Sequence, residues 1–210
     1  MKLIFVRHAE TEWNRQGVIQ GHNDSPLTAR GAQETSALLN ALTDAGYPVY
    51  GVFTSPLGRA RHMGQALAGH FQCPLAIETA LKEQSFGQYD RMTQARLARE
   101  HPNHFLALFS QDAAFCPAGG ESLACASQRI LRFVHAKMAL ATHQTFYVVT
   151  HEQVMQVMQV MQGMQGMLAQ LMDENLNIST TTHNRTPAMP CWRGAEGRTS
   201  LSAEDRHPLA

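Results

Sequence analysis

The amino-acid sequence predicts an α/β protein, a three-layer α/β/α sandwich in which helices cover both faces of a mostly parallel central sheet. Short apolar runs alternate along the chain with longer segments of helical periodicity, an order that is typical of parallel sheets. The runs are almost continuously apolar, as expected for strands that are buried on both faces. The 210 residues suit a single domain over 1–210 with a small inserted cap.

The first predicted strand spans residues 3–6 and ends in Arg7 and His8. A polar stretch rich in turn residues leads from it to a helix with Thr28 as its N-cap and Gly46 as its stop signal. One face of this helix carries an apolar stripe of Ala32, Thr35, Leu38, Leu39 and Leu42. This helical spacing predicts that the stripe faces the core.

The second predicted strand spans residues 49–53 and leads into another helix. Pro56 suits the first turn of that helix, and Arg59 falls at the same end, where backbone N–H groups favour anions. The side chains expected to face inward are Ala60, Met63, Leu67 and Phe71. A short third strand is predicted at residues 74–77.

Residues 78–121 are expected to form a small cap or lid over the sheet edge. This segment begins with a loop that contains Glu83, continues with one or two short helices broken at Pro102, and ends in an irregular stretch. Long irregular segments inside a compact domain are usually functional or mobile.

A helix is predicted over about residues 122–141, followed by a fourth strand at 146–149 that ends in Thr150 and His151. This strand repeats the arrangement of the first one, an apolar run followed by a histidine. Because open α/β sheets bind ligands at the carboxyl ends of their strands, both histidines are candidates for a functional site.

The segment after His151 contains a Val-Met-Gln repeat over residues 154–165. Its simplest interpretation is a buried helix filled by adaptable methionine side chains, and a methionine metal site is the alternative. Further strands are predicted at 177–182 and 192–201, and a polar tail at 203–210.

The composition excludes several classes of function. The 17 Lys and Arg residues balance 17 Asp and Glu residues, which argues against a broad nucleic-acid or membrane-surface interface. The four cysteines lack CxxC and metal-finger spacing, so reduced thiols in a cytoplasmic protein are expected. The apolar runs are too short for a signal peptide or for a membrane span of ~20 residues.

The polar residues at the predicted strand ends suit phosphoryl transfer. They are Arg7, His8, Arg59, Glu83 and His151. Arginine binds phosphate oxygens in a bidentate manner, neutral histidine is a nucleophile near pH 7, and a carboxylic acid protonates a leaving alkoxide. The chain has no Walker loop, GxSxG motif or metal-binding carboxylate cluster, and a zincin motif after His151 fails at Met155. A route through a phosphohistidine, without metal or cofactor, is therefore expected.

Several segments resemble the histidine phosphatase superfamily, in its phosphoglycerate-mutase-like branch. Residues 7–14, Arg-His-Ala-Glu-Thr-Glu-Trp-Asn, are similar to the RHG motif of that family. Further similar segments follow in order at 20–31, 55–60, 81–87, 120–122 and 149–151. The resemblance covers about the first three quarters of the chain and implies a phosphoglycerate-mutase-like fold.

This resemblance implies a role for each candidate residue. His8 would be the nucleophile that becomes phosphohistidine, and Glu83 would be the general acid for the leaving group and then the base for water. Arg7, Arg59 and His151 would hold the phosphoryl oxygens and stabilise the transition state. Neutral contacts to the substrate would come from Asn14, Gln20 and Gly21.

The chain departs from the family pattern at several positions. Ala9 replaces the usual glycine of the motif, and Asp90-Arg91 stands where Glu-Gly often follows the Phe-Gly block. Glu152 stands where a small residue usually follows the second histidine. A carboxylate at this position would repel phosphate if it pointed into the anion site.

These features predict a metal-independent cytoplasmic phosphatase that acts on a small phosphorylated metabolite through His8. One alternative is a cofactor-dependent phosphoglycerate mutase, which the chain length disfavours because mutases of this branch are typically longer. The other is a non-catalytic phosphate-binding regulatory protein that has kept the fold. No nucleic-acid or membrane partner is expected, and a homodimer is an open option.

Overall fold

A central sheet organises the computed structural model, which describes residues 1–109, 112–139, 143–159 and 178–181. The strands are β1 (Lys2–Arg7), β2 (Val49–Thr54), β3 (Leu75–Ile77), β4 (Thr145–Thr150) and β5 (Ile178–Thr181). The α-helices are α1 (Glu12–Arg15), α2 (Ala29–Asp44), α3 (Gly58–Phe71), α4 (Gln94–Glu100), α5 (Pro102–Phe109) and α6 (Leu123–Met138). Two 3-10 helices, η1 (Thr79–Leu81) and η2 (Gly87–Tyr89), lie between β3 and α4, and residues 152–159 are helical after β4.

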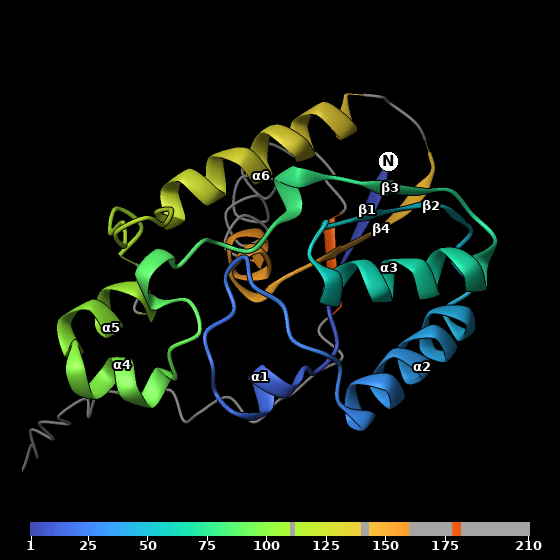
Figure 1. The fold of residues 1–210 in the computed structure, drawn as a ribbon. Coiled ribbons are helices and arrows are strands. Elements are labelled where there is room, and N and C mark those ends of the chain that lie inside the picture. The colour runs from blue at the N-terminus through green and yellow to red at the C-terminus, as the bar shows by residue number, and fades with distance from the viewer. Residues whose placement is uncertain (110–111, 140–142, 160–177, 182–210) are drawn as a thin grey trace, which may run out of the picture.

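The strand order is β3-β2-β4-β1-β5, and every pairing among these strands is parallel. Helices α2 and α3 cover one face of the sheet and α6 covers the other (Figure 1). The predicted α/β sandwich with a parallel sheet is therefore confirmed. Because β1 and β4 are neighbours near the middle of the sheet, their carboxyl ends lie side by side.

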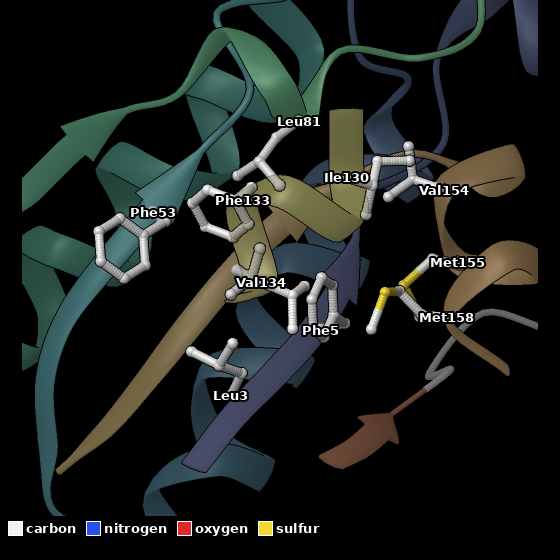
Figure 2. Packing of buried hydrophobic residues seen from close by; sticks show 11 residues of the cluster. Leu3, Phe5, Phe53, Leu81, Ile130, Phe133, Val134, Val154, Met155 and Met158 are labelled. Atoms are coloured by element: carbon white, nitrogen blue, oxygen red, sulfur yellow. The ribbon is translucent and has the colours of Figure 1, made fainter. Parts of the chain in front are cut away.

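The side chains of β1 alternate between two apolar clusters. Leu3 and Phe5 pack with α6 and with residues that follow β4, whereas Ile4 and Val6 pack with α2 and α3. Figure 2 shows the first of these clusters, in which Phe5 lies close to Val134 of α6. Burial on both faces explains why the strand is apolar at every position instead of every second one.

The predicted helix ends are confirmed at Thr28 and at Ser122, whose side chains accept from backbone N–H groups in the first turns of α2 and α6. The predicted stripe of α2 is wrong at Ala32, which is exposed. The placement of Pro56 is also wrong, because α3 begins at Gly58 with Leu57 as its N-cap. The carboxylate of Asp24, from a distant loop, accepts from the backbone N–H of Gly58 and caps this helix.

The methionines that begin the tripeptide repeat fill the α6 side of the core. Met155 and Met158 are buried in the cluster with Phe5, as is Val154 (Figure 2). The predicted buried helix is thus confirmed over residues 152–159. The rest of the repeat, the strand predicted at 192–201 and the polar tail lie outside the described residues.

Helices α4 and α5 have a small apolar cluster of their own. As predicted, two short helices are separated at Pro102. Their buried side chains pack against Ile19 and the segment around η2 in a cluster of Ile19, Phe86, Tyr89, Leu97 and Leu108. No helix among the described residues is both long and apolar enough to cross a membrane.

Arg91 adopts a left-handed backbone conformation, with φ of 69°. Its exposed guanidinium donates to Asn23 Oδ1 at 2.8 and 3.2 Å. A left-handed conformation costs a residue with a Cβ about 1–2 kcal/mol, which glycine does not incur. The local backbone therefore explains why glycine suits the position that Arg91 occupies.

We expect Arg91→Gly to be more stable than Arg91→Ala by about 1 kcal/mol in urea unfolding, because both lose the contacts to Asn23 and only glycine relieves the backbone. Comparing the two variants with each other removes the contribution of the guanidinium. If the urea unfolding curves of the two variants have the same midpoint and the same slope, the backbone at this position is not strained.

Candidate active site

The carboxyl ends of β1, β4 and β2 bring two histidines and a serine together. His8 follows β1, His151 follows β4 and Ser55 follows β2. The ring centroids of His8 and His151 lie 5.2 Å apart, and His151 Nε2 shares a hydrogen bond of 2.8 Å with Ser55 Oγ. The arrangement follows from the parallel pairing of these three strands, which places their polar ends at one edge of the sheet.

His8 is held with its Nε2 atom available for chemistry. Its Nδ1 lies 2.8 Å from the carbonyl oxygen of Ala9, and because a carbonyl only accepts, Nδ1 carries the hydrogen. Nε2 accepts from Nε–H of Arg59 at 3.3 Å. Burial, together with the charges of Arg59 and Arg7, holds the pKa of His8 well below its ordinary value. The ring is therefore neutral near pH 7, with a lone pair on Nε2.

Arg59 is fixed on all sides by protein acceptors. Its Nη1 donates to Asp24 Oδ1 at 2.8 Å and to the Asn23 carbonyl at 2.7 Å, and its Nη2 donates to the carbonyls of Gln20 and Gly21, each at 3.0 Å. Only its Nε points at His8. Asp24, which sequence reasoning missed, thus anchors the buried guanidinium through an ion pair that leaves its Nε facing the histidine.

Glu83 is a buried carboxyl group next to the start of the helix after β4. Its two oxygens accept from the backbone N–H groups of Gln84 at 2.9 Å and Gln153 at 3.3 Å. Burial raises the pKa of Glu83 above its ordinary value, and the Arg59 charge and the two hydrogen bonds oppose this rise. The raised pKa favours a protonated carboxyl, the form that a general acid needs.

Arg129 of α6 holds the backbone that carries Glu83, a role that the sequence did not reveal. Its guanidinium donates to the carbonyls of Ala80, Lys82 and Glu83 at 2.6 to 2.9 Å. The same group forms a bidentate ion pair with Glu121, at 2.8 and 2.9 Å. Arg129 is therefore a positioning residue for the buried carboxyl group.

We expect Arg129→Gln to lower kcat/KM about 10-fold to 100-fold, because a small displacement of Glu83 spoils proton transfer. The loss should be larger for alkyl phosphates, whose leaving group needs a proton, than for para-nitrophenyl phosphate. Steady-state kinetics with both substrates measures this. Arg132→Gln, at an exposed position of the same helix, is the control. Equal losses for both substrates would contradict a role through Glu83.

Arg7 and Glu152 form an ion pair beside the two histidines. Arg7 Nη2 lies 2.9 Å from Glu152 Oε2, and the Glu152 side chain is 54% exposed. The carboxylate that the sequence placed beside the second histidine therefore contacts the arginine expected to bind phosphate.

The other predicted substrate contacts lie between β1 and α2, and each has a partner within the protein. Asn14 Oδ1 accepts from the backbone and hydroxyl of Thr11, and Gln20 Nε2 donates to the same hydroxyl at 2.6 Å. The N–H of Gly21 donates to Asp90 Oδ1 at 3.1 Å. These contacts shape the loop that surrounds Arg59, and a direct role in substrate binding stays a prediction.

The arrangement combines a neutral imidazole, two cations, a second imidazole and a buried carboxyl group. His151 is fully buried, its Nδ1 has no hydrogen-bond partner among the described residues, and burial lowers its pKa well below the ordinary value. Such an atom is suited to meet a polar ligand.

No group of three or more His, Cys, Asp or Glu side chains within the described ranges is placed to hold a metal ion. The chemistry that these groups support is phosphoryl transfer to a histidine.

Comparisons with known proteins agree with this geometry. Residues 3–185 match the profile of the histidine phosphatase superfamily (branch 1). The chain is 30% identical over 155 residues to an adenosylcobalamin/alpha-ribazole phosphatase of Escherichia coli, covering 74% of this chain and 75% of the relative. It is 27% identical over 189 residues to a probable phosphoglycerate mutase GpmB of Erwinia tasmaniensis, covering 89% and 87%. The solved structure of YhfR from Bacillus stearothermophilus matches with a TM-score of 0.68 and 26% identity, covering 84% and 83%.

Proposed function

This chain belongs to the histidine phosphatase superfamily, and from that premise we propose that it hydrolyses a small phosphomonoester through a phosphohistidine on His8, without a metal ion. The observation that carries the proposal is the state of His8, a buried neutral ring with its Nε2 lone pair facing Arg59. The partner is a small phosphorylated metabolite, and the proposed location is the cytoplasm.

In the first step, His8 Nε2 attacks the phosphorus atom and the bond from phosphorus to the ester oxygen breaks. Glu83 gives its proton to the departing oxygen, so the alcohol leaves neutral and Glu83 becomes a carboxylate. Arg7 and the Nε–H of Arg59 stabilise the charge on the phosphoryl oxygens. With Ser55 donating to Nε2 of His151, the Nδ1–H of that ring donates to a third oxygen.

In the second step, the Glu83 carboxylate takes a proton from water, and the oxygen of that water attacks the phosphorus atom. The bond between nitrogen and phosphorus breaks, His8 regains its lone pair and inorganic phosphate leaves. One carboxyl group serves as acid and then as base, so the cycle returns both residues to their starting states.

The test is hydrolysis of para-nitrophenyl phosphate in the presence of EDTA. We expect para-nitrophenol and inorganic phosphate in equal amounts at an unchanged rate when EDTA is added. Loss of activity with EDTA that added divalent metal restores would overturn the metal-independent mechanism. Binding of inorganic phosphate without turnover of any phosphomonoester would favour the regulatory alternative.

A mutase activity is the second candidate, favoured by the similarity to a probable phosphoglycerate mutase. It is tested with 3-phosphoglycerate, with and without 2,3-bisphosphoglycerate, by following the 2-phosphoglycerate formed. A rate of isomerisation above the rate of phosphate release would replace hydrolysis as the proposed function.

A further inference from the structure

The ion pair between Arg7 and Glu152 places a carboxylate at the candidate phosphate site. Glu152 is the first residue of the helical segment 152–159 and directly follows His151. Its backbone is held between a buried histidine and a buried residue, Gln153. The carboxylate can therefore exchange partners by side-chain rotation, but it stays within reach of the site.

Both arginines of the site are thus accompanied by carboxylates. Arg7 pairs with Glu152 at 2.9 Å, and Arg59 pairs with Asp24 at 2.8 Å. The roles of the two carboxylates differ. Asp24 also caps α3, so its position is part of the fold, whereas the Glu152 side chain is 54% exposed and can rotate toward solvent. A phosphate that binds Nη2 of Arg7 therefore competes with Glu152 and releases its carboxylate beside the bound ester.

The released carboxylate interacts electrostatically with any charged group on the leaving alcohol of the bound ester. An ammonium group on the leaving alcohol gives it a new partner, and a carboxylate or second phosphate there is repelled. The field of Glu152 extends into the site, since its charge adds to the rise in the pKa of Glu83. The exposure of the side chain limits the effect through solvent screening.

We propose that Glu152 selects substrates by the charge of the leaving group, favouring phosphomonoesters of amino alcohols over those that carry a second anionic group. This inference rests on the proposed function, because it assumes that phosphate binds at Arg7. It also predicts weaker binding of phosphoglycerates, whose leaving groups carry a carboxylate.

The test uses three phosphomonoesters of similar size that differ in terminal charge: O-phosphoethanolamine, propyl phosphate and phosphoglycolate. Their dissociation constants are measured by calorimetry at low salt on His8→Ala, which cannot form the phosphohistidine, and on the same protein with Glu152→Gln. We expect His8→Ala to bind phosphoethanolamine about tenfold more tightly than phosphoglycolate, with propyl phosphate between them. Glu152→Gln should reduce this ratio to about twofold.

The control is Glu100→Gln in the same background, which removes one negative charge from an exposed ion pair of α4 and should leave the ratio unchanged. Binding of all three ligands with the same ratio before and after Glu152→Gln would overturn the inference and leave the proposed function intact. Binding of none of them, together with no hydrolysis of para-nitrophenyl phosphate by the unsubstituted protein, would overturn both.

Discussion

Replacing His8 with alanine is expected to lower kcat/KM for phosphomonoesters by about 10⁴-fold or more. The variant removes the Nε2 lone pair that forms the bond to phosphorus, and no other described group is positioned to replace it. His151, the nearest imidazole, has its Nε2 engaged with Ser55 and its ring centroid 5.2 Å from that of His8. With Ser55 donating to that Nε2, Nδ1 of His151 carries the hydrogen, so the ring binds the phosphoryl group and does not attack it.

The decisive measurement for His8 is a rapid quench during turnover, followed by detection of an acid-labile, base-stable phosphoprotein. We expect up to one phosphoryl group per chain in the unsubstituted protein and none in His8→Ala. His62→Ala, at an exposed position of α3, is the matched control and should keep full activity. Phosphoprotein in His8→Ala, or activity within tenfold of the unsubstituted protein, would contradict the mechanism.

Replacing Glu83 with glutamine should have the second largest effect, a loss of about 10²-fold to 10⁴-fold in kcat/KM for alkyl phosphates. Glutamine keeps the size of the side chain but supplies no proton to the departing alkoxide. The loss should be much smaller for para-nitrophenyl phosphate, because para-nitrophenolate leaves without a proton. An equal loss for the two substrates would show that the variant disturbs the site in another way.

The pH dependence of kcat/KM for an alkyl phosphate tests the same assignment. Glu83 must be protonated, so the rate falls as pH rises through its pKa, which burial places above the ordinary 4.5. His8 must be neutral, so the rate falls as pH drops through its pKa, which lies well below 6.5. Glu83→Gln should abolish the alkaline fall and leave the acidic one. Ionisation of the substrate is common to both proteins and cancels in the ratio of their rates.

The sequence by itself determined the order of strands and helices along the chain and the residues that stand at the strand ends. Apolar runs, helical periodicity and capping residues such as Thr28 are local signals, because they depend on neighbours within a few positions. The same signals placed His8 and His151 directly after strands. Parallel pairing of β1 and β4 then brings the two rings together, as the family resemblance implies.

Only the tertiary structure decided how the charged residues of the site are paired. The contacts of Asp24 with Arg59, of Arg129 with the Glu83 loop and of Glu152 with Arg7 join segments that are distant in sequence. No periodicity encodes such contacts, because they depend on the relative positions of whole elements after packing. Long-range packing also set the start of α3. The carboxylate of Asp24, from another loop, caps this helix at Gly58, and Pro56 therefore lies outside it. Local sequence determined which side chains stand at the strand ends, and long-range packing determined their charge partners.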